Sequence, residues 1–107
     1  MEKRRFKRVI VSLKAELISD GTSYTGFIEN LSENGLFVTT TPTKTAIVFT
    51  PETRCEIKFQ LPSGETLNLP CKITWAYRTP PHGITNSIGL EIIDPHPKYR
   101  EFLKTLQ

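Results

Sequence analysis

The sequence predicts an all-β fold: a six-stranded antiparallel β-barrel followed by one short C-terminal α-helix. Three observations lead to this prediction. Most of the chain alternates apolar and polar residues with a period of two, clusters of turn residues separate the alternating runs, and a helical period appears only near the end. The 107 residues suit a single domain, and 37% hydrophobic residues suffice for a modest core.

The first half of the chain contains three expected strands. Alternation over residues 9–17 predicts the first, and the polar turn at Asp20–Gly21 ends it. A second strand is expected over residues 23–29, a polar turn over 30–35, and a third strand from residue 36.

A long surface excursion is expected next, over Thr39–Pro51. This stretch is rich in threonine and contains two prolines. Within it, the apolar run 46–49 could form a brief edge strand or dock on the barrel.

The fourth and fifth strands, over residues 55–61 and 67–77, allow a prediction of register. Their large apolar residues have odd numbers, so opposed residues must have numbers with an even sum if both sets face one core. A three-residue loop at Pro62–Gly64 satisfies this and places Cys55 opposite Cys71, both as reduced core thiols; a five-residue loop is the alternative. The residues expected in the core are Cys55, Ile57, Phe59, Leu61, Leu67, Leu69, Cys71, Ile73, Trp75 and Tyr77.

A sixth strand over residues 87–93 leads into the helix, which is expected over 96–106. Asp94 followed by Pro95 has the composition of a helix start, with Asp as the N-cap. Apolar residues then follow the helical period, at Tyr99, Phe102, Leu103 and Leu106.

The net positive charge is confined to the first eight residues of the chain. The net charge is +3, but residues 1–8 alone carry five basic residues and one acidic residue, so residues 9–107 carry −1. A nucleic-acid polymer would require a basic stripe across the folded surface, so none is expected as a partner. A short basic arm suits a compact anion, although a solvated terminus is the alternative interpretation.

Other classes of function lack their sequence signals. The two cysteines and two histidines have no metal-ligand spacing, and no acid, base and nucleophile come together, so we expect neither a metal site nor an enzyme. The apolar runs are far shorter than the ~20 residues of a membrane span, and no secretory signal is evident. We therefore expect no membrane insertion and a cytoplasmic location.

Two short motifs are not explained by packing. The first is R-x-x-x-R, formed by Arg4 and Arg8, and the second is N-x-S-x-x-G, formed by Asn30, Ser32 and Gly35. Together they resemble the signatures of the PilZ domain, a bacterial receptor for cyclic di-GMP. Further similarities are Leu61–Pro62, Trp75 and Gly89–Leu90.

The resemblance implies that residues 1–8 form a ligand-binding arm on a barrel of residues 9–107, which binds cyclic di-GMP without a cofactor and signals to an effector protein. Arginine suits this ligand because its guanidinium pairs with phosphate and with guanine O6 and N7. The binding residues would be Arg4, Arg5, Arg8, Asn30, Ser32 and Gly35. A turn closed by its own Asn and Ser side chains is the alternative interpretation of the second motif.

Two other functions compete with this one. The first is a PilZ-like protein-interaction module that does not bind nucleotide. The second is a small-barrel RNA binder, which would need exposed aromatic residues. It is disfavoured here because the aromatic residues of the strands are expected in the core: Phe27, Phe37, Phe59 and Trp75.

Overall fold

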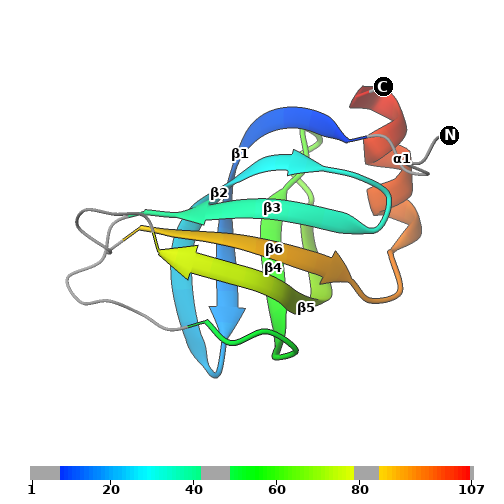
Figure 1. Ribbon diagram of the computed structural model, residues 1–107. Coiled ribbons are helices and arrows are strands. Elements are labelled where there is room, and N and C mark those ends of the chain that lie inside the picture. Colours follow the sequence, from blue (N-terminus) through cyan, green and yellow to red (C-terminus); the bar gives the residue numbers. More distant parts are fainter. Residues whose placement is uncertain (1–7, 42–48, 79–84, 107) are drawn as a thin grey trace, which may run out of the picture.

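Six antiparallel strands close into a barrel, with one helix at one end (Figure 1). This computed structural model describes residues 8–41, 49–78 and 85–106. Around the barrel the strand order is β1-β2-β3-β6-β5-β4, so the fold predicted from the sequence is confirmed. The elements are β1 (Val9–Ser19), β2 (Thr22–Leu31), β3 (Gly35–Thr40), β4 (Arg54–Gln60), β5 (Thr66–Arg78), β6 (Asn86–Ile92) and α1 (Pro97–Leu106).

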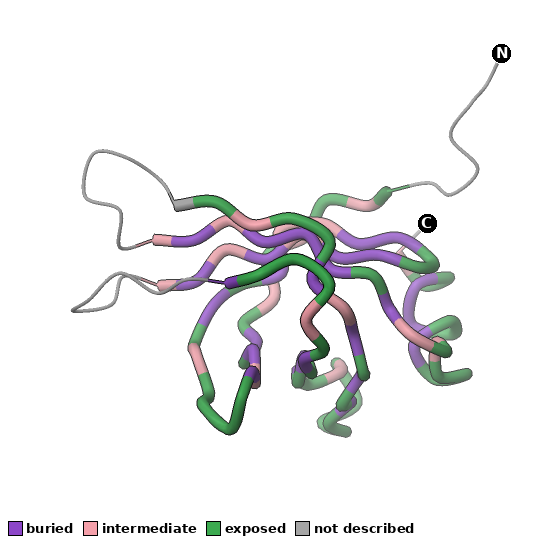
Figure 2. Tube along the Cα trace, turned by 60° about the horizontal axis from the view of Figure 1, so that its bottom comes forward, coloured by how far each residue is buried: buried purple, intermediate pink, exposed green. Residues whose placement is uncertain are grey.

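The inward-facing residues of the strands form one core, which α1 extends. Buried residues follow the strands and one side of α1, whereas exposed residues gather on the outside and at turns (Figure 2). The helix contributes Tyr99, Phe102 and Leu103, and the ring of Phe102 lies 6.1 Å from that of Phe59 on β4. The helix is therefore held by apolar packing against the barrel. No helix in the described part of the chain is long and apolar enough to cross a membrane.

The β4–β5 hairpin has the register expected from residue parity. Cys55 lies opposite Cys71, and both cysteines are buried and free. The Gly64 amide donates to the Leu61 carbonyl at 2.8 Å, and Gly64 has a φ of 94°, which a residue without a Cβ adopts at little cost. The Leu61 amide donates to the Glu65 carbonyl at 2.7 Å, so Leu61 and Glu65 close the hairpin and the three-residue loop over 62–64 is confirmed.

The prediction that Trp75 and Tyr77 face the core is wrong. The pairing of β5 with β6 shifts between Ile73 and Trp75, so Thr74 forms a bulge that reverses which side chains point inward. Trp75 is consequently 40% exposed and Tyr77 62% exposed. Parity arguments hold only as far as the next bulge.

The prediction that Phe27 and Phe37 lie in the core is also wrong. Phe27 lies on the outer face of β2 and is 38% exposed, because its neighbours Gly26 and Ile28 take the inward positions. Phe37 on β3 is half-buried between inward-facing Leu36 and Val38. Phe59 alone among the four is in the core.

The long excursion after β3 is described only at its two ends. Phe49 is buried and meets the Tyr24 ring edge-on at 5.2 Å, so the end of the apolar run docks on the barrel. The rest of the predicted run, residues 46–48, lies outside the described residues.

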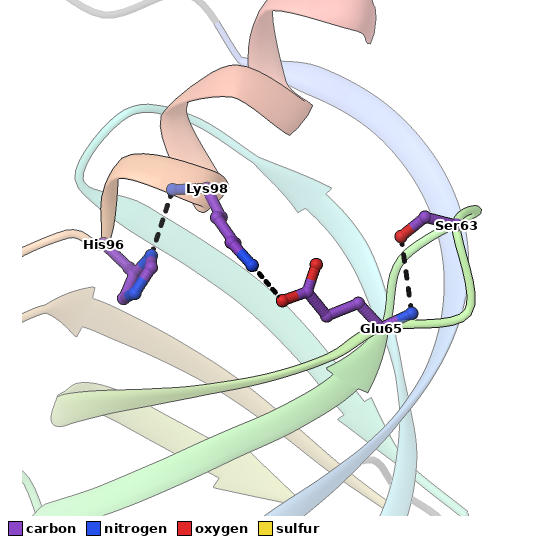
Figure 3. Close-up of polar contacts among 4 residues, drawn as sticks. All are labelled: Ser63, Glu65, His96 and Lys98. Carbon is purple, nitrogen blue, oxygen red and sulfur yellow. Dashed lines mark hydrogen bonds and ion pairs between the residues drawn. The ribbon is translucent and has the colours of Figure 1, made fainter.

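The helix begins later than Asp94–Pro95 predicts. Asp94 has a φ of 58°, so it cannot act as an N-cap, and α1 starts at Pro97. His96 is the cap instead, because its Nδ1 accepts the Lys98 amide at 3.0 Å, and Pro97 takes the first helical position (Figure 3). The Lys98 ammonium also pairs with Glu65, which ties the start of α1 to the β4–β5 loop (Figure 3).

Both thiols should react slowly in the native protein. Burial, helped by the Glu56 carboxylate, raises the pKa of Cys55 to about 11, and burial also raises the pKa of Cys71. Thiolate is the reactive form, so Ellman's reagent at pH 8 should label native protein at least about tenfold more slowly than urea-unfolded protein.

The same burial predicts alkaline destabilisation. Between pH 9 and 11 the unfolded chain loses thiol protons that the folded chain keeps, so the free energy of unfolding should fall. Fast labelling of either cysteine in native protein at pH 8 would contradict both expectations.

Candidate functional site

The turn between β2 and β3 carries the second motif, and several hydrogen bonds fix its backbone. The Ser32 amide donates to the Gly35 carbonyl at 2.9 Å and so closes the turn. The Ile92 amide at the end of β6 donates to the Asn34 carbonyl at 2.9 Å. Ser32 is 1% exposed, and its Oγ lies 3.5 Å from Asn34 Oδ1. The turn is therefore a rigid platform next to β6.

A bulge turns Asn30 outward, toward the surface of the barrel. The pairing of β2 with β3 shifts between Ile28 and Asn30, so Glu29 is an extra residue in β2. After this shift, Leu31 faces the core and Asn30 stands on the outer face, opposite Phe37. Without the bulge, strict alternation would send Asn30 into the core.

Arg8 meets this platform from the start of β1. Its Nε donates to Asn30 Oδ1 at 2.7 Å, across 22 residues of sequence. A Cβ built at Gly35 would lie 3.6 Å from Arg8 Nη1, 3.7 Å from Ser32 Oγ and only 3.3 Å from the Leu90 carbonyl. Glycine therefore lets β3 lie close to the Leu90 carbonyl of β6, and Arg8 lies within contact distance of the same backbone.

Four of the six predicted site residues come together in this way: Arg8, Asn30, Ser32 and Gly35. The other two, Arg4 and Arg5, lie outside the described residues. The interpretation of the motif as a self-capped turn accounts for part of the geometry, since Ser32 and Asn34 close the turn. It does not account for Asn30, whose side-chain oxygen accepts a bond from Arg8.

The charge of Arg8 is available to an anion. Its side chain is exposed, and the salt bridges among the described residues involve Lys72 and Lys98 but not Arg8. Within the same part of the chain, no group of three or more His, Cys, Asp or Glu side chains could hold a metal ion. The site therefore offers a guanidinium, an amide and backbone groups, which suit a polar, anionic ligand.

An exposed aromatic surface that the sequence pattern did not predict continues from the polar site. We call Phe37, Trp75 and Tyr77 the aromatic shelf. The rings of Phe37 and Trp75 are 5.6 Å apart, and those of Trp75 and Tyr77 stack at 5.3 Å. Cross-strand pairing places Asn30, Phe37, Gly89 and Trp75 in one row over β2, β3, β6 and β5.

The signal that could have located this shelf is a glycine inside a strand. A Cβ at Gly89 would lie 2.3 Å from the Trp75 ring, so the absent side chain is what lets the indole lie flat over β6. The sequence shows a glycine within a predicted strand, but only the β5–β6 register places Gly89 beside Trp75.

A family model described as PilZ domain matches residues 2–106. The chain therefore belongs to the PilZ domain family. PilZ domains are receptor and adaptor domains for cyclic di-GMP rather than enzymes, and they bind this ligand without a cofactor. A comparison with curated proteins finds no match to this sequence.

Solved structures share the fold at low sequence identity. The motility inhibitor MotI (DgrA) of Bacillus subtilis has a TM-score of 0.78 and 13% identity over 99% of this chain and 50% of its own. The PilZ domain of Escherichia coli YcgR with c-di-GMP has a TM-score of 0.71 and 12% identity, over 98% of this chain and 89% of its own. Borreliella burgdorferi PlzA in complex with c-di-GMP has a TM-score of 0.63 and 16% identity, over 95% of this chain and 50% of its own. The chain thus spans about half the length of MotI and PlzA.

Replacing Gly89 should dismantle the shelf. In Gly89→Ala the new Cβ displaces the indole, since the gap to Trp75 is too short for any carbon. Trp75 is the only tryptophan in the chain, so its fluorescence emission should move to longer wavelengths. The free energy of unfolding should fall by about 1 kcal/mol. Glu91→Ala, on the same strand, is the control; equal spectra for all three proteins would contradict the stacking.

Proposed function

We propose that this protein is a cyclic di-GMP receptor that closes its N-terminal arginine arm over the nucleotide and passes the signal to a partner protein. The observation that carries the proposal is the contact of Arg8 with Asn30 beside Ser32 and Gly35. This contact joins the two family motifs at one end of the barrel.

The groups at the site match the chemistry of the ligand. Cyclic di-GMP presents two phosphates and two guanines. With Nε engaged by Asn30, the remaining N–H groups of Arg8 can pair with a phosphate or with guanine O6 and N7. Asn30 retains its amide NH₂ for an acceptor on a base. Ser32 is almost fully buried, so its main role would be to shape the turn and not to contact the ligand directly.

The aromatic shelf extends the same surface. Because Phe37 lies opposite Asn30 and contacts Trp75, a guanine next to Asn30 could stack on a flat apolar ring. Stacking on an aromatic ring contributes about 1–3 kcal/mol per base. One surface would then supply both charge and stacking.

The arm provides the switch in this proposal. Residues 1–8 hold five basic residues and one aromatic residue, a composition that buries little apolar surface by itself. Ordering such a segment costs free energy, which ligand contacts offset, so the arm closes when nucleotide is present. A partner that recognises the closed arm would read the signal.

A nucleotide-independent interaction module remains the second candidate function. It is favoured by the exposed shelf, since contiguous exposed aromatic side chains are typical of surfaces that bind other molecules. Phe27 and Trp75 are exposed, so buried aromatic residues no longer disfavour an RNA binder. The charge still disfavours it, since residues 9–107 carry a net charge of −1.

Arg8→Ala should weaken binding strongly. By calorimetry we expect wild type to bind cyclic di-GMP at micromolar Kd or tighter, about −8 kcal/mol, and to prefer it to GTP and cyclic di-AMP. The variant should lose about 2 kcal/mol, or roughly thirtyfold in Kd. Arg54→Ala is the matched control, because this exposed arginine lies on β4, which pairs with neither β2 nor β3.

Equal affinity of Arg8→Ala and wild type would contradict the assigned role. Capture of a protein partner by a chain that gives no binding heat with cyclic di-GMP would favour the interaction module.

The arm should contribute beyond Arg8. We expect Arg4→Ala, within the R-x-x-x-R motif, to weaken cyclic di-GMP binding by about tenfold or more, and Arg5→Ala by a smaller factor. Both substitutions remove one positive charge, so their difference separates specific contact from general attraction. Equal small losses that vanish at high salt would show that the arm acts only through its charge.

A further inference from the structure

A tyrosine of the C-terminal helix reaches the motif turn from inside the protein. Tyr99 is 0% exposed, and its hydroxyl donates to the Ser32 backbone carbonyl at 2.5 Å, across 67 residues of sequence. The helix and the β2–β3 turn lie at the same end of the barrel (Figure 1). The contact therefore links α1 to the motif through the protein interior.

This hydroxyl completes the hydrogen bonding of Ser32. The Ser32 amide donates to Gly35, and its Oγ is near Asn34, so the carbonyl is the remaining polar group. A buried carbonyl without a partner is costly. Tyr99 therefore fixes the direction of the peptide group that follows Ser32, in the segment that leads to Gly35.

We propose that Tyr99 is a positioning residue for the ligand site: its hydroxyl holds the turn in the shape that presents Asn30 and Gly35 to Arg8. This inference rests on the proposed function, because it names a determinant of the same site. Because Tyr99 is fully buried, it would act through the Ser32 carbonyl and not by contact with the ligand.

The surroundings of Tyr99 suit this role. Burial, with the nearby Cys71 thiol, raises the pKa of Tyr99, whereas the Arg8 charge lowers it; the net rise keeps the hydroxyl protonated as a donor. The start of α1 is fixed independently, by the His96 cap and by the pairing of Lys98 with Glu65 (Figure 3). The ring is thus held in place by the helix, and its hydroxyl is held on the turn.

Coupling of this kind acts in both directions. If the bond of Tyr99 to Ser32 favours the binding shape of the turn, then bound nucleotide must strengthen that bond by the same factor. The contact of Tyr99 with the turn would then be more stable with ligand bound. A partner that contacts the helix could sense the nucleotide without touching it.

Tyr99→Phe tests the inference, since it removes the hydroxyl and keeps the ring. At a temperature well below both unfolding midpoints, its Kd for cyclic di-GMP should rise about five- to tenfold above that of wild type. The control is Phe102→Leu, which weakens the packing of α1 on Phe59 without touching the turn. Its Kd should stay within about twofold of wild type despite its lower unfolding midpoint.

A ligand-free measurement separates this inference from the proposed function. In NMR spectra, Tyr99→Phe should move the Asn30 side-chain amide and the Gly35 backbone amide, and Phe102→Leu should leave them in place. If wild type binds nucleotide but Tyr99→Phe binds as tightly, the inference is overturned and the proposed function stands. If wild type binds none, the proposed function fails, and unmoved Asn30 and Gly35 signals would overturn the positioning role as well.

Discussion

The pairing of β1 with β2 is the constraint on which the site depends. Val9 lies opposite Leu31 and Ile10 opposite Asn30, so the residue that precedes β1 must emerge beside the end of β2. Arg8 and Asn30 meet for this reason, and not because of any attraction between two distant segments of chain. Closing the barrel fixes this pairing from both sides, since β1 also pairs with β4 and β2 with β3. The β1–β2 pairing shifts by one residue between Ile10 and Leu13, so the register that places Ile10 opposite Asn30 arises at this irregularity and is not carried over unchanged from the core pairs further along β1.

Two bulges decide what the outer surface presents. Without the extra residue at Glu29, the alternation of β2 would bury Asn30, and without the one at Thr74 the alternation of β5 would bury Trp75. In each strand an apolar residue takes the inward position beyond the bulge: Leu31 is fully buried, and Ala76 is partly buried against the core. The barrel is thus built from regular alternation, and its outward-facing chemistry depends on the two places where alternation breaks.

Features of the fold that depend on neighbouring residues could be predicted from the sequence, whereas those that depend on residues far apart in the sequence could not. Parity fixed the β4–β5 register through Cys55 and Cys71, because side-chain alternation and loop length are local. The exposure of Trp75 was missed because a bulge depends on the neighbouring strand. The helix start was missed because Asp94 takes a positive φ and a histidine acts as the cap. The contact of Tyr99 with Ser32 joins residues 67 apart, and only the folded barrel brings them together.

The described part of the site lies on the outer face of a barrel whose interior is filled by side chains, so a ligand would be held on an open surface. Arg8, Asn30 and the shelf would contact a nucleotide from one side only. An open surface buries too little of a small ligand for tight binding, so the other side needs a cover. The arm before Arg8 begins at the edge of the site and carries two arginines and two lysines, so under the proposed function it is suited to be that cover. Under the proposed function, closing the arm would be part of the binding event, so a partner that recognises the covered surface would respond to ligand in addition to any effect that passes through Tyr99 and α1.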